Sequence, residues 1–170
     1  LSMFTHAMAL DVESIAHGLE NYRTVYLDWK TGMGRRIGAL GGMLGTGTKK
    51  IVIVCPTYAK WVWYRHFQHL SEDVVGCVHR HSDFLVVGYD ELATPLPAAD
   101  GYIFDDLSWG LKRYSQVALT FMENVAGDKV ATRVVATGNW PSALEDQHRV
   151  MAALRPREFR HQHPVPYPTG

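Results

Sequence analysis

The sequence predicts an α/β fold in which helices cover both faces of a parallel sheet. Short apolar runs, several of them rich in β-branched residues, alternate along the chain with longer stretches of helical character. Runs that are apolar at every position suit strands that are buried on both faces, as in a parallel sheet. No apolar run approaches the roughly 18 residues that a membrane span requires, so we expect no membrane partner.

Six runs are expected as strands and five stretches as helices. The strand candidates are 25–29, 51–55, 74–78, 84–87, 102–104 and 134–136, and the helix candidates are 7–21, 35–45, 58–70, 111–125 and 143–154. The strands near 25–29, 51–55, 102–105 and 133–137 are expected to be neighbours or next neighbours. The helix at 35–45 contains four glycines. Each costs up to about 1 kcal/mol relative to Ala, so this helix needs support from the sheet.

Length and charge restrict the organisation and the partners. With 170 residues, the chain is long enough for one domain with a substantial core. We expect this domain to span 1–154, followed by an extended tail at 155–170 that holds four of the eight prolines. Basic and acidic residues both number 17, so the formal net charge is zero. A neutral chain argues against a stand-alone nucleic-acid binder, although a nucleic-acid partner remains a candidate.

Cysteine usage favours a reducing environment. Cys55 and Cys77 both fall inside strand-like runs, so we expect free, buried thiols rather than a disulfide. This pattern predicts an intracellular protein without indicating a compartment. His79 and His81 have the spacing of a chelating pair on a strand, but no third ligand accompanies them, so a solvated pair is the simpler interpretation.

The most informative segment is 30–36, which reads Lys-Thr-Gly-Met-Gly-Arg-Arg directly after an apolar run. A strand that leads through a Gly-x-Gly turn into a helix directs backbone N–H groups toward one point, where an anion can bind. The expected nucleotide- or anion-binding residues are Thr31, Gly32, Met33, Gly34, Arg35 and Arg36. A phosphate-binding loop ends in a Lys that reaches the phosphates and a Ser or Thr that holds Mg²⁺. Both of these positions are arginine here.

Four further segments follow in order. They are Ile51 to Thr57, a strand that ends in Pro-Thr and precedes an aromatic helix; Phe84 to Leu92, a strand that runs into an acidic turn; Tyr102 to Asp106, a strand that ends in two carboxylates; and Val134 to Gly138, a strand with a polar end. Two carboxylates at the end of a buried strand are typical of a Mg²⁺ site near a phosphate.

Taken together, these segments resemble the first RecA-like lobe of superfamily-two helicases, and of Swi/Snf-type ATPases in particular. That family carries a D-E-M-G-L-G-K-T loop, an I-V-C-P strand before a Trp-bearing helix, a D-E-A-H box and a T-G-T-P strand end. The resemblance runs from about residue 7 to residue 159. It implies a RecA-like fold of the P-loop NTPase type, with ATP and Mg²⁺ as candidate cofactors, neither of which the residues themselves establish.

The resemblance also implies residue roles. Asp105 matches the carboxylate that binds Mg²⁺, and Asp106 matches the catalytic Glu that positions the attacking water, with one methylene fewer. The positions that match the nucleic-acid-contacting motifs of the family are Pro56, Thr57, Gly88 and Tyr89.

The departures from the family pattern point to lost catalysis. Arg35 stands where the phosphate Lys would be, and its planar fork does not reproduce a compact ammonium group. Arg36 stands where the Mg²⁺-binding Thr would be. The second lobe, whose arginine fingers are worth about 10³–10⁵ in rate in related phosphoryl-transfer enzymes, does not fit in this length. We therefore expect a degenerate, catalytically inactive lobe that acts as a binding or structural module in a larger chain or assembly.

The alternative is the ATP-binding lobe of a nucleic-acid-dependent ATPase or translocase that a second RecA-like lobe completes. Under the first interpretation, Arg35 or Arg36 should pair with Asp105 or Asp106, or an ordered anion should occupy the loop.

The aromatic helix that follows Pro56 has two interpretations. Trp61, Tyr64 and the more distant Leu70 are expected to form a core-facing stripe, which leaves Trp63 as the exposed candidate for a partner contact. The same aromatic residues could instead form a stacking platform for bases.

Overall fold

A computed structural model describes residues 6–28, 34–73, 83–126 and 132–154. Within these ranges, five strands form one sheet in the order β1-β5-β4-β2-β3, and every pairing is parallel. The strands are β1 (Thr24–Leu27), β2 (Lys50–Cys55), β3 (Asp83–Gly88), β4 (Gly101–Phe104) and β5 (Arg133–Thr137). The predicted parallel α/β architecture is confirmed, and the four strands expected to be close together are consecutive in the sheet. The expected strand at 74–78 and the tail at 155–170 lie outside the described residues.

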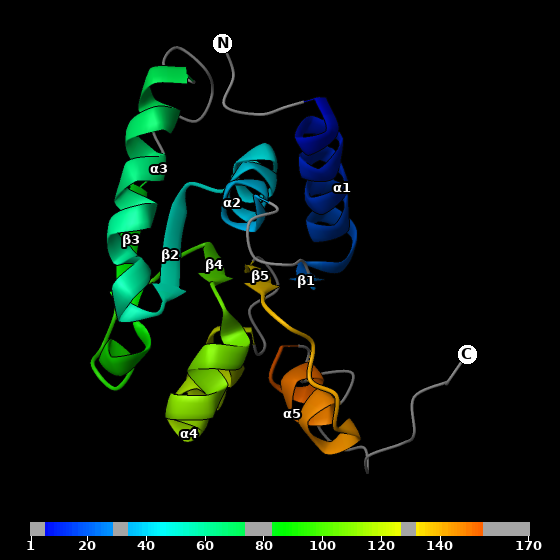
Figure 1. The fold of residues 1–170 in the computed structure, drawn as a ribbon, viewed down its shortest axis with the longest axis vertical. Helices are drawn as coiled ribbons and strands as arrows, with labels where there is room; N and C mark the ends of the chain where they lie inside the picture. Colours follow the sequence, from blue (N-terminus) through cyan, green and yellow to red (C-terminus); the bar gives the residue numbers. More distant parts are fainter. Residues whose placement is uncertain (1–5, 29–33, 74–82, 127–131, 155–170) are drawn as a thin grey trace.

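Helices cover both faces of the sheet. They are α1 (His6–Tyr22), α2 (Arg35–Gly45), α3 (Lys60–Asp73), α4 (Leu107–Ala126) and α5 (Leu144–Leu154), with short 3₁₀ turns at Thr57–Ala59 and Tyr89–Glu91. Figure 1 shows α1, α2 and α3 on one side of the strands and α4 and α5 on the other. In the described part of the chain, no helix is long and apolar enough to cross a membrane.

Two hydrophobic cores flank the sheet because successive strand residues point to opposite faces. Ile53, Ile103 and Val135 pack with the residues of α1 and α2 in one core. The alternate positions Val54 and Phe104 pack with α4 and α5 in the other. Burial on both faces explains why the strands read as continuous apolar runs in the sequence.

Helix α4 begins at Leu107, one turn before the expected start at residue 111. The backbone N–H groups of Trp109 and Gly110 both donate to the carbonyl of Asp106, so the helix starts directly after the carboxylate pair. Glycine is unfavourable inside a helix, so Gly110 by itself favours a later start. In the structure, Gly110 lies inside the helix because its lack of a side chain leaves room for Tyr89. A Cβ at this position would lie 2.5 Å from the ring of Tyr89.

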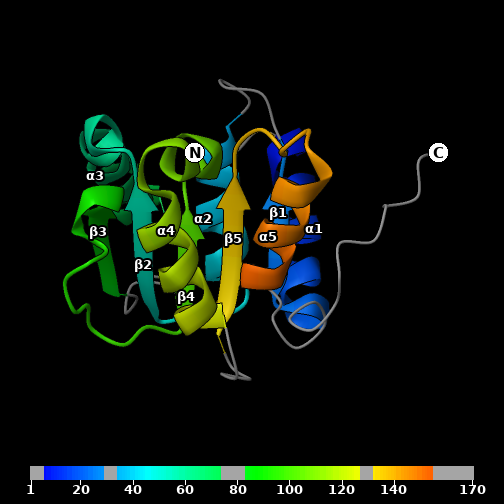
Figure 2. The ribbon, with the colours of Figure 1, turned by 90° about the horizontal axis from the view of Figure 1, so that it is seen from below.

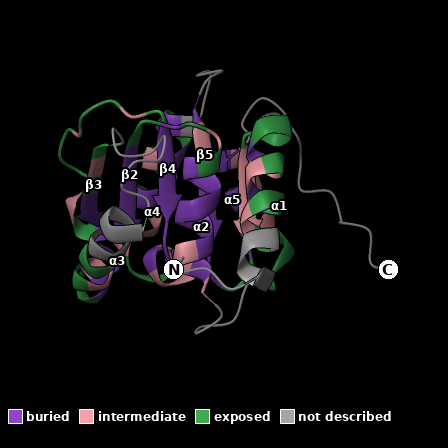
Figure 3. Cartoon of the chain, turned by 90° about the horizontal axis from the view of Figure 1, so that it is seen from above, coloured by how far each residue is buried: buried purple, intermediate pink, exposed green. Residues whose placement is uncertain are grey.

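The glycines of α2 let this helix lie in the centre of the molecule. Eight of its residues are buried, as Figure 3 shows by their colour. The closest approach is at Gly42, where a Cβ would lie 2.7 Å from the Cβ of Ile15 on α1. The low helix propensity of α2 is therefore compensated by close packing against α1 and the sheet.

The parallel arrangement also positions the candidate site. All five strands run in the same direction, as Figure 2 shows, so their carboxyl ends share one edge. The register places Leu27 beside Thr137 and Phe104 beside Ala136. The segments that follow β1, β4 and β5 therefore begin next to each other, at the edge where ligands bind in open α/β sheets.

We predict that Gly42→Ala destabilises the domain. The added methyl group meets Ile15, a β-branched side chain with a restricted χ1, and overpacking of this kind costs about 1–3 kcal/mol. This cost exceeds the gain of up to about 1 kcal/mol in helix propensity. Urea unfolding measures the change. Gly45→Ala is the matched control, because its Cβ would lie 3.3 Å from the methyl group of Ala16 and is expected to change stability little. Equal stability of Gly42→Ala and the parent chain would contradict the prediction.

Candidate functional site

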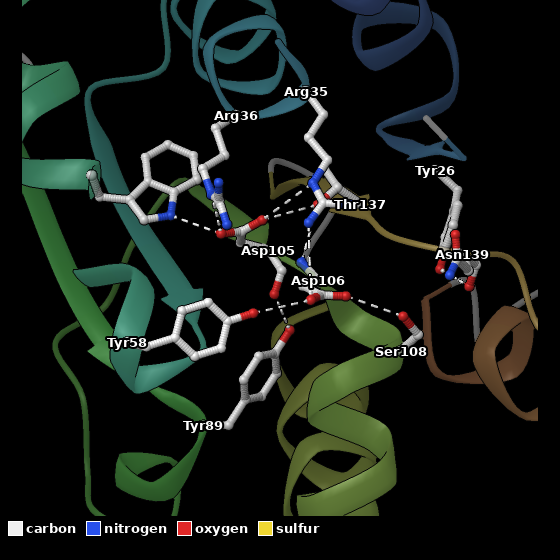
Figure 4. Close-up of polar contacts among 11 residues, drawn as sticks. Tyr26, Arg35, Arg36, Tyr58, Tyr89, Asp105, Asp106, Ser108, Thr137 and Asn139 are labelled. Carbon is white, nitrogen blue, oxygen red and sulfur yellow. Dashed lines mark hydrogen bonds and ion pairs between the residues drawn. The ribbon is translucent and has the colours of Figure 1, made fainter. Parts of the chain in front are cut away.

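Asp105 is the centre of the polar cluster at the carboxyl edge of the sheet (Figure 4). Its side chain is fully buried at the end of β4, and its backbone N–H donates to the carbonyl of Val54 at 2.7 Å. Carboxylate oxygen Oδ2 accepts hydrogen bonds from Arg36 Nε at 2.7 Å and Trp63 Nε1 at 3.0 Å. Oxygen Oδ1 accepts from Thr137 Oγ1 at 3.3 Å. Protein donors from α2, α3 and β5 thus satisfy this buried carboxylate.

Arg35 lies on the other side of the carboxylate pair. Its buried guanidinium places Nε 3.9 Å from Asp105 Oδ1 and Nη2 3.9 Å from Asp106 Oδ2. Two arginines and two aspartates therefore face each other with balanced charge. The expectation that an arginine of the loop lies within hydrogen-bond reach of the carboxylates is confirmed by the Arg36–Asp105 pair.

Asp106 has a left-handed backbone with φ of 47°, which an Asp tolerates better than most residues. Its backbone N–H donates to Thr137 Oγ1 at 3.1 Å. Its carboxylate accepts from Ser108 Oγ at 3.1 Å and from Tyr58 Oη at 3.5 Å. Burial, followed by the charge of Asp106, raises the pKa of Tyr58 above its usual value, so the phenol stays a donor at neutral pH. Thr137 links the two carboxylates, since it accepts from the backbone of one and donates to the side chain of the other.

The donor set around Asp105 does not fit Mg²⁺. This ion prefers a nearly octahedral set of oxygen ligands. Here an Arg nitrogen and a Trp nitrogen both contact Oδ2 of Asp105, and the guanidinium of Arg36 supplies a positive charge at that oxygen. Among the residues that the structure describes, no group of three or more His, Cys, Asp or Glu is arranged to hold a metal ion.

The Gly-x-Gly loop is described only from Gly34 onward. Gly34 has φ of 71° and caps α2 without a side-chain hydrogen bond, and its carbonyl accepts from the N–H of Gly38 at 2.8 Å. The left-handed conformation is one that glycine adopts at no steric cost. Thr31, Gly32 and Met33 lie outside the described residues, so nucleotide or anion binding by this loop stays a prediction.

The four residues expected to contact nucleic acid come together at the ends of β2 and β3. Thr57 is exposed, and its hydroxyl donates to Asp90 at 3.2 Å. Pro56 and Gly88 are buried, as is Tyr89, whose hydroxyl donates to the carbonyl of Asp105 at 2.9 Å. Only Thr57 therefore presents an accessible side chain for such a contact.

The expected orientation of the aromatic helix is wrong. Trp63 is 0% exposed, whereas Trp61 is 59% and Tyr64 is 54% exposed. The buried face instead runs from Ala59 through Trp63 to Phe67, at intervals of four residues. The four-residue spacing of this face is visible in the sequence, but the aromatic residues at positions 61 and 64 favoured a different face as the buried one. Sequence reasoning therefore missed the hydrogen bond from the indole N–H of Trp63 to the buried carboxylate of Asp105. A buried indole N–H needs such an acceptor.

Three further partners of the carboxylates were not expected as site residues. They are Tyr58, Ser108 and Thr137. Each is a hydroxyl residue close to a strand end, which is a weak signal by itself. The contact of Thr137 depends on β5 being next to β4, and that of Tyr58 depends on β2 being next to β4, whereas Ser108 is only two residues from Asp106.

Cys55 lies at the end of β2, near the same cluster. Its thiol is free and buried, as expected, whereas Cys77 lies outside the described residues. Burial, and then the negative charge of Asp105, raises the pKa of Cys55 to about 12. The protonated thiol thus behaves as a small apolar group beside the site.

We predict that Asp105→Ala lowers the free energy of unfolding by about 3–5 kcal/mol, because it leaves Arg36 and the Trp63 indole without their buried acceptor. Asp106→Asn is the matched control, since this neighbouring carboxylate is partly exposed and Asn tolerates its left-handed backbone. The control should cost about 1 kcal/mol or less. Urea unfolding of both variants makes the comparison. Similar losses in the free energy of unfolding in the two variants would contradict the prediction, because burial of the Asp105–Arg36 pair would then add nothing to stability.

We also predict that Cys55 reacts with Ellman's reagent only after unfolding. Its raised pKa means that the reactive thiolate is scarce below pH 12, and the native packing excludes the reagent. The measurement is made at pH 8 on Cys77→Ser, in which Cys55 is the remaining cysteine. Cys55→Ser serves as the comparison, because it reports the labelling of Cys77. Rapid labelling of Cys77→Ser in native buffer would indicate that the carboxyl edge opens readily.

Comparisons with known proteins show the fold. No family model matches the chain, and no curated protein matches it. The SWI2/SNF2 ATPase core of Sulfolobus solfataricus, solved in complex with dsDNA, is similar with a TM-score of 0.66 and 12% identity, over 91% of this chain and 36% of that chain. A hypothetical ATP-dependent RNA helicase from Sulfolobus tokodaii is similar with a TM-score of 0.63 and 13% identity, over 96% of this chain and 52% of that chain.

This chain therefore spans only part of the length of both similar structures. At these identities the likeness is one of fold, and it agrees with the parallel α/β architecture described above. The chain has the RecA-like fold of a helicase lobe.

Proposed function

We propose that this chain is a RecA-like lobe that does not hydrolyse ATP and acts as a binding or structural module within a larger chain or assembly. One observation carries the proposal. Arg36 donates to the buried carboxylate of Asp105 at 2.7 Å, at the position where the resemblance to helicase lobes would place Mg²⁺. The protein thus supplies its own cation to the carboxylate.

Metal binding would require this pair to break. Asp105 is fully buried, and removal of one partner from a buried pair costs about 3–5 kcal/mol. Trp63 would also have to give up its acceptor or share it with the ion. A Mg²⁺ ion held by one carboxylate recovers little of this cost, because the ion retains most of its waters in such sites.

The second carboxylate is equally unsuited to activating water. Asp106 accepts from Ser108 and Tyr58, and Arg35 Nη2 lies 3.9 Å from it. A general base must be free to accept a proton from the attacking water. In this structure the two oxygens of Asp106 are already engaged by hydroxyl donors and lie near a cation.

The size of the similar structures supports the larger context. This chain spans 36% and 52% of those two chains, so comparable proteins contain substantial further structure. One of them was solved on dsDNA. By analogy we propose nucleic acid as a candidate partner of the assembly, with the exposed Thr57 as the contact residue. We also propose an intracellular location.

The alternative function is an ATP-binding lobe that a second RecA-like lobe completes. It is favoured by the arrangement of Gly34, Asp105 and Thr137 at one edge of the sheet, which retains the layout that the resemblance implies. Under this alternative, an arriving nucleotide would attract Arg35 and Arg36 to its phosphates and release the carboxylates.

Calorimetric titration separates the two functions. We predict that the chain shows no Mg²⁺-dependent binding of ATP or ADP and no ATP hydrolysis, with or without nucleic acid. The double variant Arg35→Lys/Arg36→Thr removes the competing guanidinium groups and should gain Mg²⁺-dependent nucleotide binding. Arg23→Lys/Arg65→Thr, which changes two exposed arginines after α1 and on α3, is the matched control and should behave like the parent. ATP turnover by the parent chain that disappears in Asp105→Asn would overturn the proposal.

A further inference from the structure

A cavity of about 610 Å³ lies between α4, α5 and the segment that joins β5 to α5. Both helices pack on the face of the sheet opposite to α2 (Figures 1 and 2). Asp106 and Ser108 contribute to its wall, but Arg35 and Gly34 do not. The volume falls in the range of small-molecule sites, about 300–1,000 Å³. The cavity is therefore separate from the described end of the loop at Gly34 and Arg35, although Asp106 belongs both to its wall and to the cluster around Asp105.

Two indoles line this cavity, and they differ in availability. Trp109 is surrounded, with the guanidinium of Arg113 at 4.4 Å from its ring centre and the ring of Tyr58 at 5.8 Å. Trp140 is half-buried and makes one described ring contact, an edge-to-face packing with Tyr26 at 4.6 Å. Its backbone N–H donates to Asp28 at 3.1 Å, which holds the residue in place. Trp140 is thus an anchored aromatic surface that a planar ligand can stack on.

Three cationic side chains surround the indoles. Lys112, Arg113 and Arg149 are all exposed and line the cavity. Within the described ranges, none of the three forms an ion pair, and Arg149 donates only to Ser115 Oγ at 3.4 Å. Two carboxylates, Asp106 and Asp146, also line the wall, so cations are in excess even though the whole chain is neutral. Cations without a carboxylate partner beside a Trp are suited to phosphate.

We propose that this cavity binds a nucleotide unit, that is, a nucleobase that carries phosphate. The base stacks on Trp140, and the phosphate contacts Lys112 and Arg149. Stacking on an aromatic ring next to cations is the general means by which proteins bind single strands without sequence preference, and a free nucleotide offers the same chemistry. This site goes beyond the proposed function, because it needs neither Mg²⁺ nor the Gly-x-Gly loop.

The test measures binding of two probes that carry this chemistry from different sources. Fluorescence anisotropy follows a labelled 12-residue oligothymidylate, and calorimetry without Mg²⁺ follows AMP. Trp140→Ala should weaken binding about tenfold or more, and Trp140→Phe should retain most of it. For the oligonucleotide, Lys112→Ala and Arg149→Ala should each reduce the slope of log K against log salt by about 0.7.

Matched controls come from the other side of the molecule. Trp61→Ala removes an exposed indole from α3, and Lys49→Ala removes an exposed cation from the turn after α2. Both variants should bind like the parent chain. If Trp140→Ala does not fold, as judged by circular dichroism, the exposed pair Lys112→Glu/Arg149→Glu decides the matter and should abolish binding.

The outcomes distinguish the sources. Oligonucleotide binding without AMP binding identifies a strand, AMP binding without oligonucleotide binding identifies a free nucleotide, and either supports the proposal when the cavity variants weaken it. Absence of binding to both probes overturns it, as does binding that depends on Trp61 and not on Trp140. Mg²⁺-dependent ATP binding that Asp105→Asn abolishes and Trp140→Ala preserves would overturn the proposed function and leave the cavity proposal standing.

Discussion

The buried carboxylate of Asp105 is the point on which the carboxyl edge of this protein depends. A lone ionised carboxylate in such a place would be very costly, so its position at the end of β4 requires donors from the surrounding elements. Arg36 from α2, Trp63 from α3 and Thr137 from β5 supply them. Each donor comes from a different element, and one charge therefore fixes the relative positions of two helices and two strands.

The same contacts that stabilise the fold argue against metal-dependent chemistry. A Mg²⁺ site needs carboxylate oxygens that face water and phosphate, whereas here one oxygen of Asp105 accepts from two protein nitrogens and the other accepts from a Thr137 hydroxyl. Arg35 and Arg36 neutralise the charge of the two carboxylates, so the site needs no further cation for charge balance. An assembly module needs this rigidity, whereas an ATPase lobe needs a site that rearranges with its nucleotide. This difference is the physical basis for proposing a binding or structural module in preference to an ATP-hydrolysing lobe.

Asp106 connects the two regions of interest. One of its oxygens lies near Arg35, and the other accepts from Ser108 at the wall of the cavity. Its left-handed backbone turns the chain from β4 into α4, and its carboxylate therefore belongs both to the ion-pair cluster and to the wall of the cavity between α4 and α5.

The sequence by itself determined the fold class, because runs that are apolar at every position can be buried only as interior strands between two helical layers. It also determined that two arginines, Arg35 and Arg36, follow the Gly-x-Gly turn directly. The tertiary structure decided which arginine makes the short bond, which face of the aromatic helix is buried, and where a cavity forms. The bonds of Asp105 to Arg36 and Trp63 span 69 and 42 residues, so no local pattern encodes them. Periodicity favoured position 61 as buried, whereas in the structure Trp63 is inside because it packs with Ala59 and Phe67 and its indole N–H donates to the buried carboxylate.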